Sequence, residues 1–332
     1  MLADRNVSFL GAIVLGCLVS FAFFGQAAER PNIIWLSCED MSPNLGCYGD
    51  PVAQTPTIDK LAARGIRFTN ACSVGGVCAP SRSSIITGIY PSSLGTHLMR
   101  CQAPLPDFVK TFPTYLRQAG YYCTNNQKTD YQFKPPAGAW DESSARAHWR
   151  HRPSKDQPFF AVFNFVGSHE SAIVSAEKSN LITKGLAKTP RDEAARTLPP
   201  YYPDTPAVRE EWGRFYDGIA ATDRWVAEHL RELEEDGLLD NTIVFFWSDH
   251  GVGLPRGKRT IYDSGVHVPL VVAYPSTSTD APKGAVDDRL VSLMDLGPTV
   301  LNLAGLPIPE KIDGRPFLGP NLPAPRTELY LI

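Results

Sequence analysis

The sequence has no strong charge of either sign, no internal repeat and no low-complexity tract. Its 32 lysine and arginine residues face 35 aspartate and glutamate residues, which leaves a net charge of −3 at pH 7. A chain without a basic field is not drawn to nucleic acid, so we expect no nucleic-acid partner. The absence of a repeat period of about 20–50 residues argues against solenoids and propellers. With 43% hydrophobic and 20% charged residues in 332 positions, the chain is globular, and its length predicts one large domain or two modest ones.

Zinc-binding cysteine patterns are also missing. The sequence has seven cysteines, but no CxxC pair and no histidine partner at zinc-finger spacing. Six cysteines follow the N-terminal apolar segment: Cys38, Cys47, Cys72, Cys78, Cys101 and Cys123. If Cys78 is set aside for chemistry, five remain, so at least one of them is a free thiol, and the sequence does not define any disulfide pairing.

The N-terminus has the parts of an export signal. Arg5 precedes an apolar run from Val7 to Phe24, and the small residues near Ala27 suit cleavage by a signal peptidase. We therefore predict a signal peptide over residues 1–27 and a mature chain over 28–332, with no stable membrane insertion after cleavage. The expected location is the periplasm or the medium, or a lysosome-like compartment in a eukaryote. The run is about 18 residues long, so an uncleaved anchor is one alternative; lipidation at Cys17 is a weaker one, because the run continues past it.

Short apolar runs alternate with helical patterns, which predicts an α/β fold with helices on the faces of a sheet. We expect buried strands over Asn32–Ser37, Tyr121–Thr124, Phe159–Phe165, Thr242–Ser248 and Pro269–Ala273. Proline marks three helix starts, at Thr55-Pro56, Ala79-Pro80 and Phe112-Pro113. A longer helix is predicted from Val208 to Asp236, because its apolar residues recur in steps of three, four or seven. The proline-rich segment Ser171–Pro206 is expected to be an irregular insertion that shapes a binding site.

Two predicted strands end in acidic residues. The first strand leads to Glu39 and Asp40, and the strand Thr242–Ser248 leads to Asp249 and His250. Because open α/β sheets bind ligands at the carboxyl ends of their strands, these four side chains are expected to converge. Three carboxylates and an imidazole suit a divalent cation, with Ca²⁺ favoured by the oxygen ligands and Mg²⁺ or Mn²⁺ as alternatives. The competing interpretation is that the polar residues only terminate the strands.

Cys78 is expected at the start of a helix that ends near Gly88. Free N–H groups and the helix dipole at that position favour an anion and a reactive sulfur. Arg82 lies four residues later on the same helical face and can bind an oxyanion there. A buried cysteine of purely structural role is the simpler interpretation of this pattern alone.

The segment Cys78-Ala79-Pro80-Ser81-Arg82 is followed by Thr87-Gly88-Ile89-Tyr90-Pro91. These residues resemble the C-x-P-x-R signature region of the type I sulfatases. Further motifs stand in the family's order: Pro31-Asn32-Ile33-Ile34, Glu39-Asp40, Gly46-Cys47-Tyr48-Gly49, Thr55–Ala62, Ser248-Asp249-His250-Gly251, Gly257-Lys258, Asp295–Thr299 and Asp313-Gly314. Within the family, Leu198–Pro206 is most similar to members that resemble heparan N-sulfatase (sulfamidase).

The resemblance implies an alkaline-phosphatase-like three-layer sandwich around a central, mostly parallel sheet. In this family the signature cysteine is oxidised to formylglycine, so a formylglycine-generating maturation enzyme is an implied partner and a sulfated carbohydrate the implied substrate. Carried over by position, the implied Ca²⁺ ligands are Glu39, Asp40, Asp249, His250 and the modified Cys78. The implied catalytic residues are Cys78, Arg82, Lys128, His169 and Lys258.

Four positions depart from the family pattern. Glu39 stands where aspartate is usual, and its longer side chain is expected to shift or loosen the metal. Asp130 occupies the place of a histidine, so that contact is not carried over. His267 stands where arginine is common, and His250 where many members have asparagine.

The chemistry of sulfate transfer matches this assignment. One hydroxyl of the hydrated aldehyde is the expected nucleophile, activated by the metal and Arg82. Lys128 and Lys258 are expected to bind the sulfate oxygens as charge redistributes. His169 is the expected acid for the leaving group, with Lys258 as the alternative. The second hydroxyl then expels sulfate and restores the aldehyde, which serine or threonine cannot do.

Two other functions fit the same residues. Phosphate and phosphonate ester hydrolases share the fold, and phosphonate hydrolases can share the signature. The third function is a catalytically inactive binder of sulfated glycans. It is suggested because the chain stops after Arg326–Ile332 in a strand-like pattern, whereas sulfatases generally continue into a smaller C-terminal domain, expected here to be truncated or missing. The basic and aromatic segment His148–Arg152 is either a contact for an anionic sugar chain or, more simply, a solvated loop.

Overall fold

A single sheet of eight strands lies at the centre of the described part of the chain. The computed structural model describes residues 30–275, 277–278 and 281–332. The strands are β1 (Asn32–Cys38), β2 (Gly65–Cys72), β3 (Tyr122–Asn126), β4 (Glu142–Ser143), β5 (Phe159–Phe165), β6 (Thr242–Ser248), β7 (Leu270–Ala273) and β8 (Ala285–Ser292). Their order across the sheet is β4-β3-β5-β1-β6-β7-β2-β8. Among the pairings of the described strands, only the two made by β7 are antiparallel, which confirms the mostly parallel sheet.

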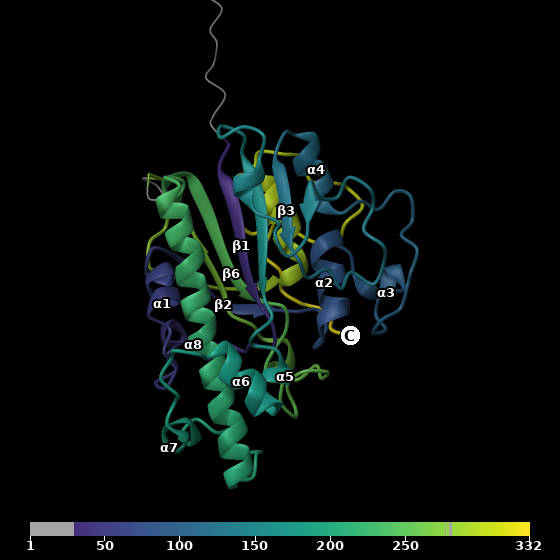
Figure 1. The fold of residues 1–332 in the computed structure, drawn as a ribbon. Coiled ribbons are helices and arrows are strands. Elements are labelled where there is room, and N and C mark those ends of the chain that lie inside the picture. Colours follow the sequence, from purple (N-terminus) through teal and green to yellow (C-terminus); the bar gives the residue numbers. More distant parts are fainter. Residues whose placement is uncertain (1–29, 276, 279–280) are drawn as a thin grey trace, which may run out of the picture.

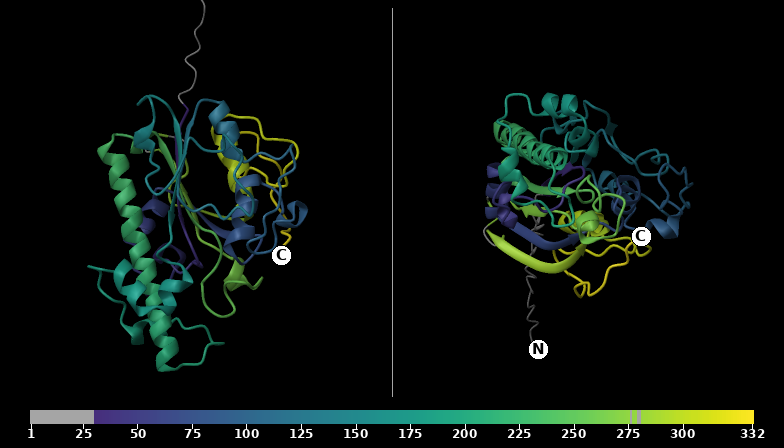
Figure 2. Two further views of the ribbon diagram at one scale, coloured as in Figure 1. Left: turned by 45° about the vertical axis from the view of Figure 1, so that its right-hand side comes forward. Right: turned by 90° about the horizontal axis from the view of Figure 1, so that it is seen from below.

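Helices cover both faces of this sheet and make three layers (Figure 1, Figure 2). The helices are α1 (Pro56–Ala63), α2 (Cys78–Thr87), α3 (Pro91–Leu94), α4 (Phe112–Gln118), α5 (Glu170–Val174), α6 (Ala176–Ile182), α7 (Arg191–Ala195), α8 (Pro206–Glu235), α9 (Asp263–Val266) and α10 (Leu296–Leu303). Side chains of α1 and α8 belong to the apolar cluster on one face. Side chains of α2, α4 and α10 belong to the cluster on the other face. The three-layer α/β prediction is therefore confirmed.

Strand β1 shows why the sheet is buried on both sides. Ile33 and Trp35 point into one apolar cluster, and Ile34 and Leu36 point into the other. All four side chains are buried. A strand covered on both faces needs a continuous apolar run instead of an alternating one, and this is what the sequence of β1 provides.

The predicted helix starts are confirmed within one or two residues. Proline occupies the first turn of α1, α4 and α8, where its missing N–H leaves no bond unmade. The side chain of Thr205 caps α8 by accepting from the Val208 N–H. Helix α2 ends at Gly88, whose φ of 70° suits a residue without a Cβ.

Three strands were not predicted, and one segment expected to be irregular is partly helical. Strand β4 has only two residues, and β8 carries charged residues at the edge of the sheet, so neither has an apolar run. Strand β2 mixes buried and half-exposed positions. Between residues 171 and 206, short helices α5 to α7 replace the expected irregular chain, because the prolines precede helices or lie between them instead of interrupting them.

The cysteines lie within the described residues, with the exception of Cys17. All six described cysteines are free thiols, in agreement with the expectation of at least one. The predicted signal peptide, residues 1–27, lies outside the described residues. Among the described helices, none combines the length and apolar character needed to cross a membrane.

Candidate active site

Strands β1 and β6 bring the two predicted acidic pairs together. The strands are parallel neighbours, with Cys38 paired with Ser248. The Asp249 N–H donates to the carbonyl of Cys38 at 3.3 Å, so the residues that follow the two strands stay side by side. As a result, Asp40 Oδ1 lies 3.2 Å from His250 Nε2. The convergence predicted from the sequence is confirmed.

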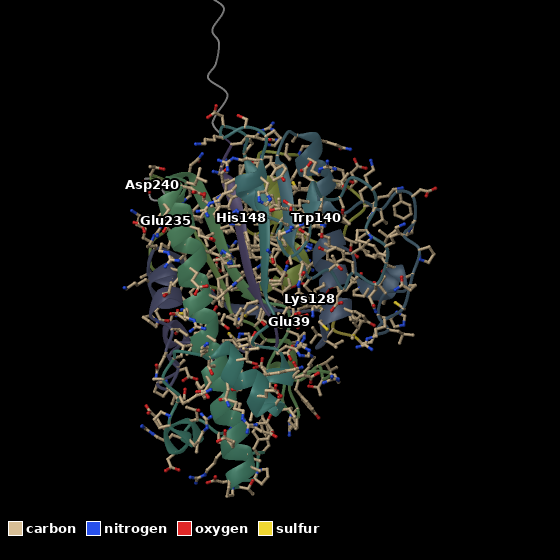
Figure 3. All side chains as sticks on the ribbon, in the orientation of Figure 1. Glu39, Lys128, Trp140, His148, Glu235 and Asp240 are labelled. Carbon is tan, nitrogen blue, oxygen red and sulfur yellow. The ribbon has the colours of Figure 1, made fainter. Side chains whose placement is uncertain are left out.

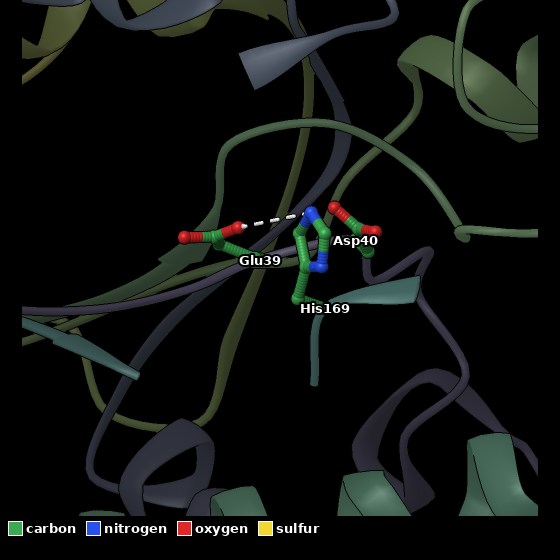
Figure 4. Close-up of side chains that lie close together, drawn as sticks. All are labelled: Glu39, Asp40 and His169. Atoms are coloured by element: carbon green, nitrogen blue, oxygen red, sulfur yellow. Dashed lines mark ion pairs between the residues drawn. The ribbon is translucent and has the colours of Figure 1, made fainter. Parts of the chain in front are cut away.

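Two overlapping groups of side chains have the spacing of a metal site. One group is Asp40, Asp249 and His250, and the other is Glu39, Asp40 and His169. Within each group, one ligand atom per residue lies within 4.8 Å of the others. Figure 4 shows the second group, in which His169 points its ring toward the carboxylate of Glu39. Asp40 belongs to both groups and is fully buried, so it lies at the centre of any cation site here.

The surroundings of His250 suit a bound cation. Its Nδ1 lies 3.0 Å from the carbonyl oxygen of Gly251, which can only accept, so Nδ1 carries the proton. Nε2 faces Asp40 Oδ1 at 3.2 Å and Asp249 Oδ1 at 3.5 Å, and it is buried without a hydrogen-bond partner within the described residues. When the imidazole is neutral, Nε2 and the two carboxylate oxygens are three buried acceptors, and these repel one another unless a cation lies between them. The residues present therefore fit a divalent cation bound mainly by oxygen.

Glu39 extends the site toward a lysine. Its Oε1 lies 2.6 Å from Lys128 Nζ, and Figure 3 shows the two side chains next to each other. Neither oxygen of Glu39 has a hydrogen bond of good geometry within the described residues, although the side chain is only 1% exposed. Asp130 binds the same ammonium at 3.1 Å. The residue that replaces the family's histidine thus contacts Lys128.

Cys78 is the first residue of α2 and is buried. Burial, together with the negative charge of Asp249, raises the pKa of the Cys78 thiol to about 11, although Lys128 and Lys258 act in the opposite direction. An unmodified thiol here is therefore protonated at neutral pH. The raised pKa argues against the reactive sulfur expected at the helix start, because burial outweighs the charges of the nearby lysines.

Arg82 connects α2 to two strands of the sheet. Its Nε donates to Asp249 Oδ2 at 2.9 Å, and its Nη1 donates to Asn164 Oδ1 at 2.8 Å. Its Nη2 has no hydrogen-bond partner among the described residues, although the side chain is buried. Burial alone would raise the pKa of Asp249, but the positive charges around it, which include those of Arg82, Lys128 and Lys258, lower it to about 2. Asp249 is consequently an anion at neutral pH.

Lys258 and His169 meet beside Asp40. Lys258 Nζ lies 3.0 Å and 2.9 Å from the two oxygens of Asp40, and 3.1 Å from His169 Nε2. The Ser171 N–H donates to His169 Nδ1 at 3.2 Å, which favours a proton on Nε2, whereas the Lys258 ammonium donates toward Nε2 and favours a lone pair there. Nε2 faces the interior of the site, where Glu39 Oε2 is 3.9 Å away.

Sequence reasoning missed three residues that hold this constellation in place. Asn164 orients Arg82, and the Ser81 hydroxyl donates to the Asp249 carbonyl at 2.6 Å. Glu170 lies 3.4 Å from Lys258 Nζ and makes two short bonds to Arg259. A signal was available for Asn164, which is an amide in the otherwise apolar run of β5.

His267 and the segment His148–Arg152, which the sequence analysis also singled out, make contacts that hold the fold together. His267 Nε2 donates to the Thr69 carbonyl at 2.8 Å, and Nδ1 lies 3.5 Å from Asp263, so it fastens a loop near β2. In the segment His148–Arg152, Trp149 is fully buried and donates to Asp236. Arg150 donates to the same carboxylate at 2.7 Å. The described contacts of this segment are therefore structural, and they support neither a sugar contact nor a fully solvated loop.

The chain belongs to the sulfatase family. The model of that family, described as "Sulfatase", matches residues 31–153 and 122–306. An "Ulvan-active sulfatase" of Formosa agariphila is 42% identical over 330 residues, covering 88% of this chain and 55% of that protein. The human "N-sulphoglucosamine sulphohydrolase" is 28% identical over 332 residues, covering 89% of this chain and 65% of the relative. The chain thus spans less than two thirds of the length of these relatives.

Solved structures confirm the fold. A protein in complex with its substrate D-glucosamine-2-N,6-O-disulfate superimposes with a TM-score of 0.65 at 21% identity, covering 86% of this chain and 78% of the other. A phosphonate monoester hydrolase from Silicibacter pomeroyi gives a TM-score of 0.66 at 20% identity, covering 87% and 76%. At this level of identity the similarity shows the architecture alone, which is that of the alkaline-phosphatase-like sulfatases.

Proposed function

We propose that this protein hydrolyses sulfate ester or N-sulfate groups of a sulfated carbohydrate, using formylglycine derived from Cys78 and a divalent cation, with Ca²⁺ favoured. The observation that carries the proposal is that the signature helix meets the acidic strand ends: Arg82 binds Asp249 at 2.9 Å, and Asp249 lies in the group with Asp40 and His250. We further propose that residues 28–332 form one catalytic domain, which is exported after removal of residues 1–27.

The metal ligands, Cys78 and Arg82 have separate roles in the proposed sulfate transfer. When bound, the cation would be held by Glu39, Asp40, Asp249 and His250 together with modified Cys78, and would supply Lewis-acid stabilisation of negative oxygen. Formylglycine would supply a hydroxyl nucleophile in its hydrated form. Arg82 holds one edge of the site through its two buried hydrogen bonds and keeps Nη2 for an oxyanion.

Lys128, Lys258 and His169 are proposed to bind the sulfate and to transfer the proton. Lys128 and Lys258 are both buried enough for their charges to act strongly on the equatorial oxygens. His169 Nε2 lies 3.1 Å from Lys258 Nζ. We propose that a protonated His169 gives a proton from Nε2 to the leaving oxygen or nitrogen, with Lys258 as the competing donor.

The relatives suggest the substrate class. One is an ulvan-active sulfatase and another an N-sulphoglucosamine sulphohydrolase. Both names denote sulfated carbohydrates, so a sulfated polysaccharide is the proposed substrate. The experiment is sulfate release from ulvan, glycosaminoglycans and N-sulfoglucosamine, in parallel with an aryl phosphonate. Faster cleavage of the phosphonate would favour the alternative that the fold also supports.

Maturation of Cys78 is tested separately. Peptide mass spectrometry of the segment Phe68–Arg82 on protein from the native source must separate Cys78 from Cys72, which lies in the same peptide. An aldehyde at Cys78 is the expected result and implies a formylglycine-generating partner. A plain thiol or disulfide at Cys78 would contradict catalysis and favour an inactive glycan binder. The variant Cys78→Ala is the control, since it cannot be matured.

A further inference from the structure

The loop after β6 contacts both the candidate active site and a separate cavity. On one side, its Lys258 reaches Asp40, and the backbone at Gly253 is so close that a Cβ would lie 2.6 Å from Asp40 Oδ2. On the other side, Pro255 and Arg256 line a cavity of about 340 Å³ that also involves the segment before α8. Figure 1 shows this light-green loop beside α5 at the carboxyl end of the sheet. The cavity is therefore joined to the candidate active site by a few residues of backbone.

The cavity has both apolar and polar walls. Its apolar and aromatic lining is formed by Tyr201, Tyr202, Pro203, Val208, Trp212, Leu254 and Pro255. Arg256 and Glu211 provide its charged groups. The Tyr202 hydroxyl donates to the Pro255 carbonyl and so ties the two walls together. At about 340 Å³ the cavity falls in the range of roughly 300–1,000 Å³ that is usual for small-ligand sites.

Two aromatic rings and a constrained backbone hold the Arg256 side chain in place. Its guanidinium carbon lies 4.7 Å from the ring centre of Tyr201 and 4.4 Å from that of Tyr262. Its carbonyl accepts from the hydroxyls of Thr260 and Ser264, which holds the backbone at a φ of 64°. Such a left-handed conformation is costly for a residue other than glycine. The side chain is thus oriented by two aromatic contacts and by a constrained backbone.

The contacts of Arg256 leave its donors available. Aromatic rings occupy the faces of the guanidinium, whereas its N–H groups point outward in the plane. Among the described residues, no carboxylate forms an ion pair with this guanidinium and no acceptor binds its N–H groups. A preoriented guanidinium fork matches two oxygens of a carboxylate or a sulfate. The side chain is also exposed, so a ligand can reach it.

We infer that this cavity is a subsite for an anionic sugar residue of the polysaccharide chain whose sulfate occupies the candidate active site. Arg256 binds the carboxylate or sulfate of that residue, the tyrosine rings pack against its ring, and Glu211 accepts from its hydroxyls. The inference rests on the proposed function for the identity of the chain. A proline-rich peptide is the other occupant that aromatic walls can suit, but the unpaired guanidinium favours an anion.

Binding, measured apart from turnover, tests this subsite. The parent is the Cys78→Ala variant, titrated calorimetrically with sulfated ulvan oligosaccharides. We expect Arg256→Ala to weaken binding about tenfold and Arg256→Lys to weaken it less, because lysine keeps the charge but loses the fork. Tyr201→Ala should weaken binding several-fold. Arg231→Ala is the matched control, since Arg231 is an exposed arginine on α8 that pairs only with Glu235 in the described structure.

Chemically altered oligosaccharides identify the anion. Loss of the Arg256 dependence after carboxyl reduction assigns a carboxylate, and loss after desulfation assigns a sulfate; either result supports the subsite. Equal binding by the parent and by both Arg256→Ala and Tyr201→Ala overturns it, as does capture of a proline-rich peptide in place of the sugar. If the mature enzyme releases no sulfate but binding still depends on Arg256, the proposed function fails while the subsite stands.

Discussion

Arg82 donates from Nε to Asp249 Oδ2 at 2.9 Å, although the two residues are 167 positions apart in the chain. The bond is buried at both ends, with side chains 4% and 0% exposed. It joins the signature helix α2 to the end of β6, so the position of Cys78 at the start of α2 depends on the same carboxylate that faces His250. A buried ion pair of this kind fixes an arrangement more than it adds stability.

Asn164 is predicted to be a positioning residue for Arg82. The variant Asn164→Ala removes the acceptor of Nη1 and leaves a buried donor unpaired, which costs about 1–3 kcal/mol. If Arg82 acts on the transition state, we expect kcat for sulfate release to fall about tenfold or more while KM changes little. Steady-state kinetics on purified, matured protein measures this split.

A control distinguishes positioning from a general loss of stability. Asn302 donates to the carbonyls of Leu318 and Pro320, outside the constellation that contains Arg82. Asn302→Ala should reduce thermal stability but keep kcat. An Asn164→Ala enzyme with unchanged kcat would contradict the role given to Asn164.

The proposed metal ion would compete with Lys258 for the same oxygens of Asp40. Lys258 Nζ contacts both, at 3.0 Å and 2.9 Å, and the two side chains are 3% and 0% exposed. In Lys258→Met the buried carboxylate loses its counter-charge, at a cost of about 3–5 kcal/mol. Ca²⁺ can replace that charge, so it should raise the melting temperature of the variant more than that of the parent.

Melting curves in EDTA and in excess Ca²⁺ measure this difference. Lys188→Met is the matched control, because Lys188 pairs with the buried carboxylate of Asp217 at 3.7 Å, away from the candidate metal ligands. Ca²⁺ should raise the melting temperature of Lys188→Met by the same amount as that of the parent. If Ca²⁺ also raises the melting temperature of Lys258→Met only by that amount, the cation does not bind at Asp40.

Glu39 is predicted to bind the cation despite its longer side chain. In Glu39→Gln one ligand charge is lost and Lys128 loses its partner at 2.6 Å. Because affinity for hard cations follows ligand charge, we expect Ca²⁺ affinity to fall about tenfold or more, whereas Glu39→Asp should bind Ca²⁺ more tightly than Glu39→Gln. Calorimetric titration of metal-free protein measures both. The exposed Glu177 on α6 provides the control Glu177→Gln, and equal affinities for all variants would exclude Glu39 as a ligand.

The sequence allowed the main strands and the acidic strand ends to be predicted, because both depend on local pattern. Buried parallel strands such as Phe159–Phe165 and Thr242–Ser248 are continuous apolar runs, and their predicted bounds coincide with those of β5 and β6. Helix α8 could be predicted from the spacing of its apolar residues. Strand β8 could not, since its residues are held by pairing with β2 instead of by their own apolar character.

The sequence predicts that the acidic strand ends converge, but it does not predict the contacts among the residues gathered there. The sequence order of Asp40 and Lys258 says nothing about the 2.9 Å contact between them, because 218 positions separate the two. The effect of burial on the Cys78 thiol also depends on neighbours from other elements. For the same reason, the cavity beside Arg256 has no sequence signal, since its walls come from two distant segments.

A histidine on α8 that is only 15% exposed should make the stability of the fold depend on pH. His229 packs between Phe163 and Trp225, with ring centres 4.3 Å and 4.8 Å away. Burial lowers its pKa below the usual 6.5, although the Glu232 carboxylate at 2.8 Å acts in the opposite direction. His148, on the other side of Glu232, also has a pKa lowered by burial.

The sign of the effect follows from proton binding. Since the folded pKa is below the unfolded one, the unfolded chain binds more protons as the pH falls through about 6.5, and the free energy of unfolding decreases. Each such histidine contributes at most about 1.4 kcal/mol per pH unit to that slope. His229→Phe keeps an aromatic ring between Phe163 and Trp225 but cannot titrate. Denaturant unfolding between pH 7 and pH 5 should therefore show a shallower slope for His229→Phe than for the parent or for the exposed control His97→Gln, and parallel curves for all three would show that His229 does not contribute.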